Sequence, residues 1–380
     1  MNTRPVLDSD KGPFALSASF NADNSCFSVA LESGFRVFSS KSGDQKIARE
    51  IGGGLGQAEM LGTTRYIALV GGGKAPKFPQ NKVQIFNDST QSVSTSLELS
   101  APIQRIRLSQ THIIIALLHS VRIYRMALPP SLIASYETIA NPHGLCTLGS
   151  SIIAFPGRAV GQVKVYDLAT GNVSIIPAST SALRALALSK DCTQIATASE
   201  AGTLVRLWSF PSCTKTAELR RGVDPAVILG LAFSPSGTAL AVTSDKGTLH
   251  IFDLPSGGGS GETGTTSSDH KWRMLSKLPL LPRQFSDTYS NCSTPFSLGD
   301  DYTSATAGSS SAGRAESTGN IGIQGVPGGR PTKGLLGWLD ESTVLCVGAG
   351  QDARWERFVV GYDEGGRRAV WREGWRRYLD

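Results

Sequence analysis

A short run of β-forming residues that ends in an aromatic recurs along this chain of 380 residues. Six such runs follow one another at intervals of 48, 38, 42, 42 and 44 residues, and helix-period patterns are nearly absent between them. A period of roughly 40–45 residues, with room for four strands, is typical of a β-propeller of the WD-repeat type, in which each unit forms one blade. The aromatics that end the runs are Phe38, Phe86, Tyr124, Tyr166, Trp208 and Phe252.

The units carry the strand pairs that a propeller blade requires. Leu229–Val242 contains two β-forming runs around a Ser-Pro-Ser-Gly turn, which predicts a hairpin. The WD dipeptide is degenerate, since Tyr166-Asp167 keeps only the acid and Trp208-Ser209 only the tryptophan. Six units end near residue 254, and a seventh pattern runs over Gly334–Val360. We therefore predict an all-β, seven-bladed β-propeller, with residues 1–380 in a single domain.

The regular pattern lapses between the sixth and seventh units. Residues 255–290 predict a long loop of blade six, and residues 299–333 a glycine-rich, low-complexity insertion that we expect to be disordered. Within 271–289, apolar side chains are interleaved with lysine and arginine. This composition fits an interfacial membrane anchor, and it fits equally a segment that packs back onto the propeller. The apolar residues proposed for membrane insertion are Trp272, Leu278, Leu280, Leu281 and Phe285.

Charge and hydropathy indicate a protein that meets membranes only at their surface. The net charge of +6 and the pI near 9.0 favour an anionic partner surface, without choosing between a membrane and a nucleic acid. No run of 18 apolar residues is present, and Met1–Gly12 lacks the apolar core of a signal peptide. The six cysteines are scattered without a C-x-x-C pair, which fits a reducing compartment and argues against zinc or disulfides. We expect a cytoplasmic protein.

The sequence offers no motif for catalysis. The glycine runs Gly52–Gly56 and Gly71–Ala75 lack the P-loop spacing and do not open a helix, so we interpret them as loops between strands. The five histidines show no metal-ligand spacing, and no serine lies in a G-x-S-x-G elbow. We therefore expect no enzymatic activity, no cofactor and no metal.

The pair Arg220-Arg221 stands between two stretches that are predicted to form sheet. In an extended segment, successive side chains point to opposite sides, so the two arginines would serve two different places. An arginine fork suits phosphate, and Gly222 lets the backbone turn closely after it. A solvated basic loop is the alternative for any such pair. We expect both guanidinium groups to be exposed and unpaired in the free protein.

The segment Leu219-Arg220-Arg221-Gly222 and the blade end Thr243–Phe252 resemble the PROPPIN (WIPI-type, SVP-like) family of WD-repeat phosphoinositide-binding autophagy proteins. Val70–Val83 and Ala196–Arg206 are also similar, and together they indicate the branch that holds the third and fourth human members. The resemblance implies a non-enzymatic propeller that binds phosphatidylinositol 3-phosphate and phosphatidylinositol 3,5-bisphosphate. It also implies peripheral attachment to pre-autophagosomal, endosomal and vacuolar membranes, and recruitment of autophagy machinery there. We expect a monomer in solution and no nucleic-acid partner.

The resemblance implies two lipid-headgroup pockets on the rim, one on each side of the arginine pair. In these pockets arginine forks would take phosphate, while hydroxyls and a histidine bond the remaining oxygens. The family usually has Ala-His before blade five, whereas this chain has Ala178-Ser179, which puts the strength of the first pocket in doubt. Pocket one would be lined by Arg220, Ser199, Thr203 and Arg206; pocket two by Arg221, Ser244, Lys246, Thr248 and His250.

Two further surfaces follow from the same resemblance. The long sixth-blade loop coincides with the loop that the family is thought to insert into the bilayer, and two shallow headgroup sites with an apolar wedge would give reversible attachment. An autophagy lipid-transfer protein is the implied partner, docking near Asn21 and Asp23 and the loop Lys74–Lys77. Asn and Asp that merely form a turn are an equal alternative there. The rival for the whole chain is a protein-interaction propeller with an incidental basic rim.

Overall fold

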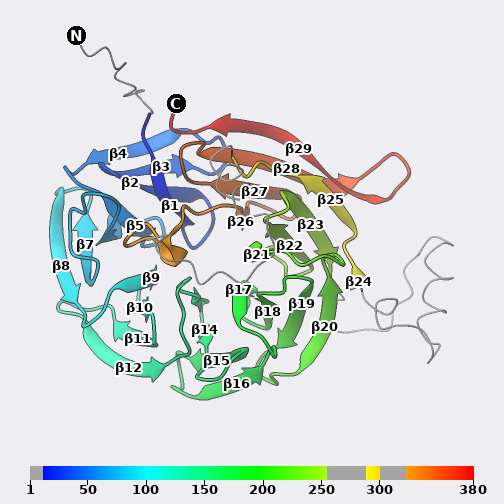
Figure 1. The fold of residues 1–380 in the computed structure, drawn as a ribbon, viewed down its shortest axis with the longest axis horizontal. Coiled ribbons are helices and arrows are strands. Elements are labelled where there is room, and N and C mark those ends of the chain that lie inside the picture. The colour runs from blue at the N-terminus through cyan, green and yellow to red at the C-terminus, as the bar shows by residue number, and fades with distance from the viewer. Residues whose placement is uncertain (1–11, 255–287, 300–321) are drawn as a thin grey trace, which may run out of the picture.

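Seven small antiparallel sheets are arranged around a central axis in the computed structural model, which describes residues 12–254, 288–299 and 322–380 (Figure 1). The first three sheets are formed by β1 (Ala15–Phe20), β2 (Cys26–Leu31), β3 (Gly34–Ser39) and β4 (Gln45–Glu50); by β5 (Leu55–Met60), β6 (Tyr66–Gly71), β7 (Lys82–Asn87) and β8 (Ser92–Glu98); and by β9 (Ile103–Leu108), β10 (His112–Leu117), β11 (Ser120–Arg125) and β12 (Ser131–Glu137).

The remaining four sheets complete the ring. They are formed by β13 (Thr147–Leu148), β14 (Ile152–Pro156), β15 (Gln162–Asp167) and β16 (Val173–Pro177); by β17 (Leu183–Leu188), β18 (Gln194–Ser199), β19 (Leu204–Ser209), β20 (Lys215–Arg220) and β24 (Thr288–Tyr289); by β21 (Ile228–Phe233), β22 (Ala239–Ser244), β23 (Thr248–Asp253) and β25 (Cys292–Pro295); and by β26 (Leu335–Trp338), β27 (Thr343–Gly348), β28 (Arg354–Tyr362) and β29 (Arg368–Arg377).

The prediction of a seven-bladed, all-β propeller is confirmed. Each of the six recurring aromatics lies on the third strand of its blade, where alternate side chains enter the apolar layers between neighbouring blades. These layers form the core: one of them, between blades five and six, contains Val205, Leu219, Phe233 and Phe252, all buried. The aromatic period therefore reports one packing position that is repeated around the ring.

The ring closes by packing between the first blade, β1–β4, and the last blade, β26–β29, which come from opposite ends of the described chain. Phe27 and Phe38 stack at 5.2 Å between ring centroids, and Tyr378 meets both from the last segment of the chain at 5.3 and 4.9 Å. The indole of Trp355 in blade seven donates a 2.9 Å hydrogen bond to the carbonyl of Ser40 in blade one. Aromatic contacts and hydrogen bonds thus replace a strand shared between the two ends.

The antiparallel order gives the propeller two different faces. Turns between first and second strands lie at one end of the blades, which we call the turn face. Turns between second and third strands, and the links from each blade to the next, lie at the other end, which we call the link face. Residues 199–204 and 244–248 are second-to-third turns on the link face, and the arginine pair opens the link between their two blades.

Two local features depart from the predicted plan. The two-residue strand β24 adds to the edge of blade five in parallel, with Leu219 opposite Thr288 and Arg220 opposite Tyr289. Residues 322–333, the end of the stretch expected to be disordered, are ordered and contain the short 3-10 helix η2 (Pro327–Gly329). This segment is held by backbone bonds, including Gly73 N to Gln324 O at 2.9 Å and Gly328 N to Pro142 O at 2.8 Å. Residues 300–321 lie outside the described part of the chain.

Candidate functional site

The arginine pair lies on the rim of the link face, between blades five and six. Arg220 is the last residue of β20 and pairs with Leu204 of β19 and Tyr289 of β24. The next amide, Arg221 N, donates to Thr203 O at 3.0 Å, so the extended pairing continues by one residue. The two arginines are therefore consecutive residues of one extended segment at the edge of blade five, the backbone conformation in which successive side chains point to opposite sides.

Arg221 is held within the free protein, so the expectation of an exposed, unpaired side chain is wrong for this residue. Only 9% of it is exposed. Its Nε donates to Gly202 O at 3.1 Å, and its Nη2 donates to the carbonyl of Asp224. Burial lowers the pKa of Arg221, while the charges of Asp245 and Asp224 oppose that shift. Arg220 is half-buried, so the expected exposure is not met by this residue either.

The burial of Arg221 results from the way the link folds back toward blade five. Ala226 N donates to Ala201 O at 3.3 Å, and Val227 N donates to Asp245 Oδ1 at 3.0 Å, which ties the link to both second-to-third turns. Gly202 has a φ of +61°, and a Cβ at this position would collide with the Ala226 carbonyl oxygen. The turn of blade five can therefore accept the arginine and the link only with glycine here.

On the blade-six side, four side chains form a continuous hydrogen-bonded chain. Ser244 Oγ lies 3.3 Å from Thr248 Oγ1, which lies 3.1 Å from His250 Nε2. His250 Nδ1 lies 3.1 Å from Ser290 Oγ, at the start of the segment that leads into β25. The structure thus brings together three residues predicted for pocket two and adds Ser290. The sequence held no signal for Ser290, which is forty positions from His250 and becomes its neighbour only through the pairing of β23 with β25.

The same cluster has a defined charge state. Burial, and then the positive charge of Arg221, lower the pKa of His250 to about 4, so its imidazole is neutral at pH 7. Lys246 is exposed in the turn between β22 and β23. The residues predicted for pocket two therefore comprise a fixed guanidinium, an exposed ammonium, two hydroxyls and a neutral imidazole.

On the blade-five side, the predicted residues are less available. Ser199 is 7% exposed, and Thr203 is half-buried. Arg206 Nε donates to Glu218 Oε2 at 2.9 Å across β19 and β20, and Lys215 Nζ lies 3.2 Å from the same oxygen. Burial opposes the shift, but the hydrogen bonds and charges of Arg206 and Lys215 lower the pKa of Glu218. The charge that Arg206 would offer to pocket one is already compensated.

Ser179 forms a turn in the link before blade five. Its amide donates to Gly161 O at 2.9 Å, and its Oγ accepts the amide of Ser181 at 3.1 Å. The side chain also lies 3.3 Å from Ser181 Oγ. The position where the family usually has histidine is thus used here for a local hydroxyl-to-backbone bond, a common role of serine in turns.

The residues predicted for a protein partner do not form one surface. Asn21 is 4% exposed and closes the turn between β1 and β2, where its Oδ1 accepts Cys26 N at 3.0 Å. Asp23 accepts Ser25 Oγ at 2.7 Å in the same turn. These contacts fit the turn-forming alternative. The loop Lys74–Lys77 lies at the other end of the blades, since its Lys77 N bonds Gly54 O beside the start of β5.

The predicted membrane-insertion residues Trp272, Leu278, Leu280, Leu281 and Phe285 lie outside the described residues. The chain re-enters the described structure at β24, where Tyr289 is 50% exposed beside Arg220. Within the described ranges, no helix has the length and apolar character needed to cross a membrane. The same residues contain no group of three or more metal-ligating side chains.

Comparisons with known proteins give one family. A model of the PROPPIN family matches residues 15–299. SVP1-like protein 2 of Emericella nidulans is 49% identical over 84% of this chain and 99% of its own length, and the protein of that name from Neurospora crassa is 39% identical over 100% and 99%. Among solved structures, Kluyveromyces lactis Hsv2 superposes with a TM-score of 0.72 at 20% identity, covering 96% of this chain and 99% of that one. A complex of KlAtg21 with the coiled-coil of AgAtg16 gives 0.67 at 17% identity over the same shares.

Proposed function

The chain belongs to the PROPPIN family of phosphoinositide-binding autophagy propellers, and on that premise we propose that it is a non-enzymatic membrane effector. It binds phosphatidylinositol 3-phosphate and phosphatidylinositol 3,5-bisphosphate through two rim pockets around Leu219–Gly222. Bound there, it recruits autophagy machinery to pre-autophagosomal, endosomal and vacuolar membranes from the cytoplasm. Its branch within the family stays a prediction.

The observation that carries this proposal is the cluster on the blade-six side of the arginine pair. Arg221 is fixed by two backbone carbonyls and acts on the pKa of His250, which is bonded to Thr248. A fixed guanidinium keeps donors for an incoming phosphate and loses little side-chain entropy when it binds. The two hydroxyls and the imidazole can turn their hydrogen bonds toward the remaining oxygens of a headgroup.

A phosphate in this pocket changes the protonation of His250. The imidazole is neutral at pH 7 because burial and Arg221 disfavour its charged form. A bound dianion beside it offsets both effects and raises the pKa of His250, so binding takes up a proton as the pH falls. We therefore expect the affinity of pocket two for a phosphate headgroup to increase as the pH falls below neutral.

The position of β24 supports a joint role for the headgroup pockets and the sixth-blade loop. The segment that leaves after β23 returns at the edge of blade five, where Tyr289 stands opposite Arg220. The end of the proposed membrane-insertion loop is thus tied to the described structure beside the arginine pair. Because one end of the loop is held next to the two proposed headgroup pockets, binding at either would raise the effective concentration of the other contacts at the membrane.

Protein partners belong to the same proposal. Because KlAtg21 is solved with the coiled-coil of AgAtg16, a helical coiled-coil is one partner class that we propose for this propeller. A lipid-transfer protein is the other, and the separation of Asn21 from Lys74–Lys77 means that it would use one of these two regions rather than both.

Flotation on liposomes tests the proposed function. Neutral phosphatidylcholine vesicles are compared with vesicles that also contain phosphatidylinositol 3-phosphate, its 3,5-bisphosphate or phosphatidylserine. We expect flotation with the two phosphoinositides and little with phosphatidylserine, because the pockets recognise phosphates on inositol rather than surface charge alone. Equal flotation on phosphatidylserine would reduce the rim to a non-specific basic surface, and no flotation on any vesicle would favour a propeller that binds only proteins.

A further inference from the structure

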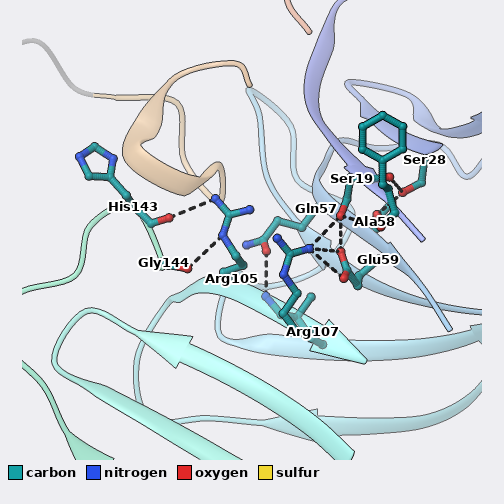
Figure 2. A network of polar contacts seen from close by, with 11 residues as sticks. Ser19, Ser28, Gln57, Ala58, Glu59, Arg105, Arg107, His143 and Gly144 are labelled. Atoms are coloured by element: carbon teal, nitrogen blue, oxygen red, sulfur yellow. Dashed lines mark hydrogen bonds and ion pairs between the residues drawn. The ribbon is translucent and has the colours of Figure 1, made fainter. Parts of the chain in front are cut away.

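The β28–β29 hairpin of the last blade is rich in arginine, but these charges are compensated within the protein. Each arginine on its two strands has a carboxylate within 2.7–3.3 Å: Arg354 and Arg377 with Asp352, Arg357 with Glu373, Arg368 with Asp253, Arg372 with Glu356, and Arg376 with Asp44. The central channel follows the same rule at Arg107, which donates to both carboxylate oxygens of Glu59 at 2.9 and 3.1 Å (Figure 2). A partner that recognises this hairpin must therefore use other side chains.

The turn between the two strands adds no positive charge. Its charged residues are Asp363, Glu364 and Arg367, which sum to −1. The Asp363 carboxylate accepts the amides of Gly365 and Arg367 at 2.9 and 2.8 Å, so it is used to fix the turn. Attraction between charges thus gives no reason for an anionic ligand to bind here.

What the hairpin does expose is aromatic. Tyr362 is 67% exposed, Trp371 45% and Trp375 51%. Among the described residues, the one other aromatic that is comparably exposed is Tyr289, on β24 at the edge of blade five. The exposed aliphatic side chains lie on blades two to four and, at Val223, in the link after blade five. Exposed aromatics are therefore confined to the sector of blades five to seven, which also contains the arginine pair.

The turn end of the hairpin lies beside the base of the sixth-blade loop. β28 and β29 are nine and ten residues long, and their turn extends outward past β25 (Figure 1). Near that turn, Arg368 pairs at 3.3 Å with Asp253, the last residue of β23, and its guanidinium lies over the Tyr362 ring at 5.2 Å. The hairpin is thus fixed at the point from which residues 255–287 leave the described structure.

The two tryptophans differ in their surroundings. The register of β28 with β29 shifts between them, which places Trp371 and Trp375 on opposite faces of blade seven. Arg354 lies over the Trp375 ring at 4.9 Å. The indole of Trp371 crosses Gly361, where a Cβ would lie 3.0 Å from the ring. Trp371 is therefore supported from the backbone while almost half of it stays exposed, so little side-chain entropy is lost when it is covered.

We propose that the turn end of the β28–β29 hairpin is a second membrane-contact site, which binds the interfacial layer of a bilayer through Tyr362 and Trp371. This inference rests on the proposed function and adds to it a contact that needs no phosphoinositide. Tyrosine and tryptophan favour the membrane–water interface because each joins an apolar ring to a polar O–H or N–H. The compensated arginines exclude attraction by charge as the cause, so the contact is expected to resist salt.

Contact quenching by brominated lipids tests the position of Trp371 directly. The full chain carrying Trp272→Phe is mixed with vesicles of phosphatidylinositol 3-phosphate and phosphatidylcholine that is brominated near the headgroup end of its acyl chains. We expect quenching that Trp371→Phe largely removes and Trp375→Phe leaves in place, because Trp375 lies four residues, about 10–13 Å, farther from the turn. The other described tryptophans are buried and stay out of contact with lipid: Trp208, Trp338 and Trp355.

Vesicle partition gives the size of the effect. Tyr362→Ser with Trp371→Ser should weaken partition about ten-fold at both low and high salt, because two interfacial aromatic surfaces are lost. Its affinity for a soluble headgroup should equal that of the wild type. The matched control is Leu132→Ser with Ile175→Ser, since these residues are 54% and 52% exposed on the outer strands of blades three and four. The control pair should partition like the wild type.

Several results would overturn the proposal. If the wild type floats on phosphoinositide vesicles but Trp371 is not quenched, or if both serine pairs partition equally, this contact is wrong and the proposed function stands. If the wild type floats on no vesicle, the proposed function fails and this contact falls with it. A partition loss that vanishes at high salt would assign the contact to charged residues. A dimer in sedimentation that the Tyr362 and Trp371 pair abolishes would assign the hairpin to a second copy of the chain. If that serine pair fails to fold, the quenching of the phenylalanine variants decides.

Discussion

The two sides of the arginine pair differ in how much of their chemistry is already committed in the free protein. Toward blade six, Arg221 is fixed by backbone carbonyls and lies near a neutral His250, which is bonded to Thr248 on one side and to Ser290 on the other. Toward blade five, the charge of Arg206 is compensated by Glu218, and Ser179 is bonded within its own turn. If the proposed pockets bind phosphate, the blade-six side is already arranged for it, whereas the blade-five side must first release an internal partner. The difference teaches that two neighbouring arginines of one motif can stand in unequal surroundings, and it leads us to expect two proposed pockets of unequal strength.

The largest expected effect comes from removing both arginines. Arg220→Thr with Arg221→Thr should abolish flotation on phosphoinositide liposomes, because charged hydrogen bonds contribute about 1.5–3 kcal/mol each. Arg221→Thr should also lower the melting temperature, since Gly202 O and Asp224 O lose their donor. Arg220→Thr alone should leave the melting temperature nearer to that of the wild type. If the folded double variant floats as well as the wild type, the arginine pair does not form the lipid-binding site.

The next largest effect separates headgroup recognition from attachment. Deleting residues 272–285 should abolish stable flotation while leaving the affinity for a soluble inositol phosphate headgroup unchanged. Each apolar side chain that enters a bilayer contributes about 1.5–3 kcal/mol before ordering costs, so their joint loss outweighs weak headgroup binding. Replacement of the same residues by a Gly-Ser linker of equal length controls for chain connectivity. A variant that floats as well as the wild type would mean that this segment is not the anchor.

A smaller effect isolates the blade-six side. His250→Ala should weaken headgroup binding several-fold and flatten the increase in affinity between pH 7 and pH 5, since a bound phosphate raises the pKa of that imidazole. In the free protein a falling pH has the opposite effect: protonation of His250 lowers the stability of the fold. Because burial holds the pKa of His250 near 4, its stabilising contribution is present above pH 6.5 and declines as the pH falls toward 4. A pH profile that is identical in wild type and variant would show that His250 takes no part.

The smallest effect is a gain on the blade-five side. Glu218→Gln should release Arg206 and Lys215 for an incoming phosphate and tighten headgroup binding by about two- to five-fold, as expected for partly exposed charge pairs. Glu137→Gln is the matched control, since its ion pair with Arg158 at 3.1 Å lies on another part of the rim. Equal behaviour of the two variants in calorimetry would mean that pocket one does not use Arg206.

The sequence predicted the fold well because the aromatic period reports one packing position on every third strand. It could not reveal β24, since two residues that pair in parallel with β20 have no period of their own. Composition also misjudged residues 322–333, where glycine permits close approach rather than disorder. Gly325 packs directly against Gly71 and Gly72, and a Cβ on Gly325 would collide with the Gly71 carbonyl oxygen.

The sequence predicted which side chains lie together on the blade-six side, but it did not predict their burial or their internal partners; their role in binding stays a prediction. Ser244, Thr248 and His250 meet because they lie on one hairpin, which a motif can specify. The burial of Arg221 depends on the link folding back over Gly202, and the pairing of Arg206 with Glu218 depends on strand register; a motif records neither. Ser290 joins the cluster only through the return of the chain to β25.

The most direct test of the unequal-site account is a calorimetric titration with a soluble, short-chain phosphatidylinositol 3-phosphate. We expect two sites per chain with different affinities, the tighter one weakened by His250→Ala and the weaker one strengthened by Glu218→Gln. Two sites of equal affinity, or a tighter site that His250→Ala leaves unchanged while Glu218→Gln alters it, would contradict the account.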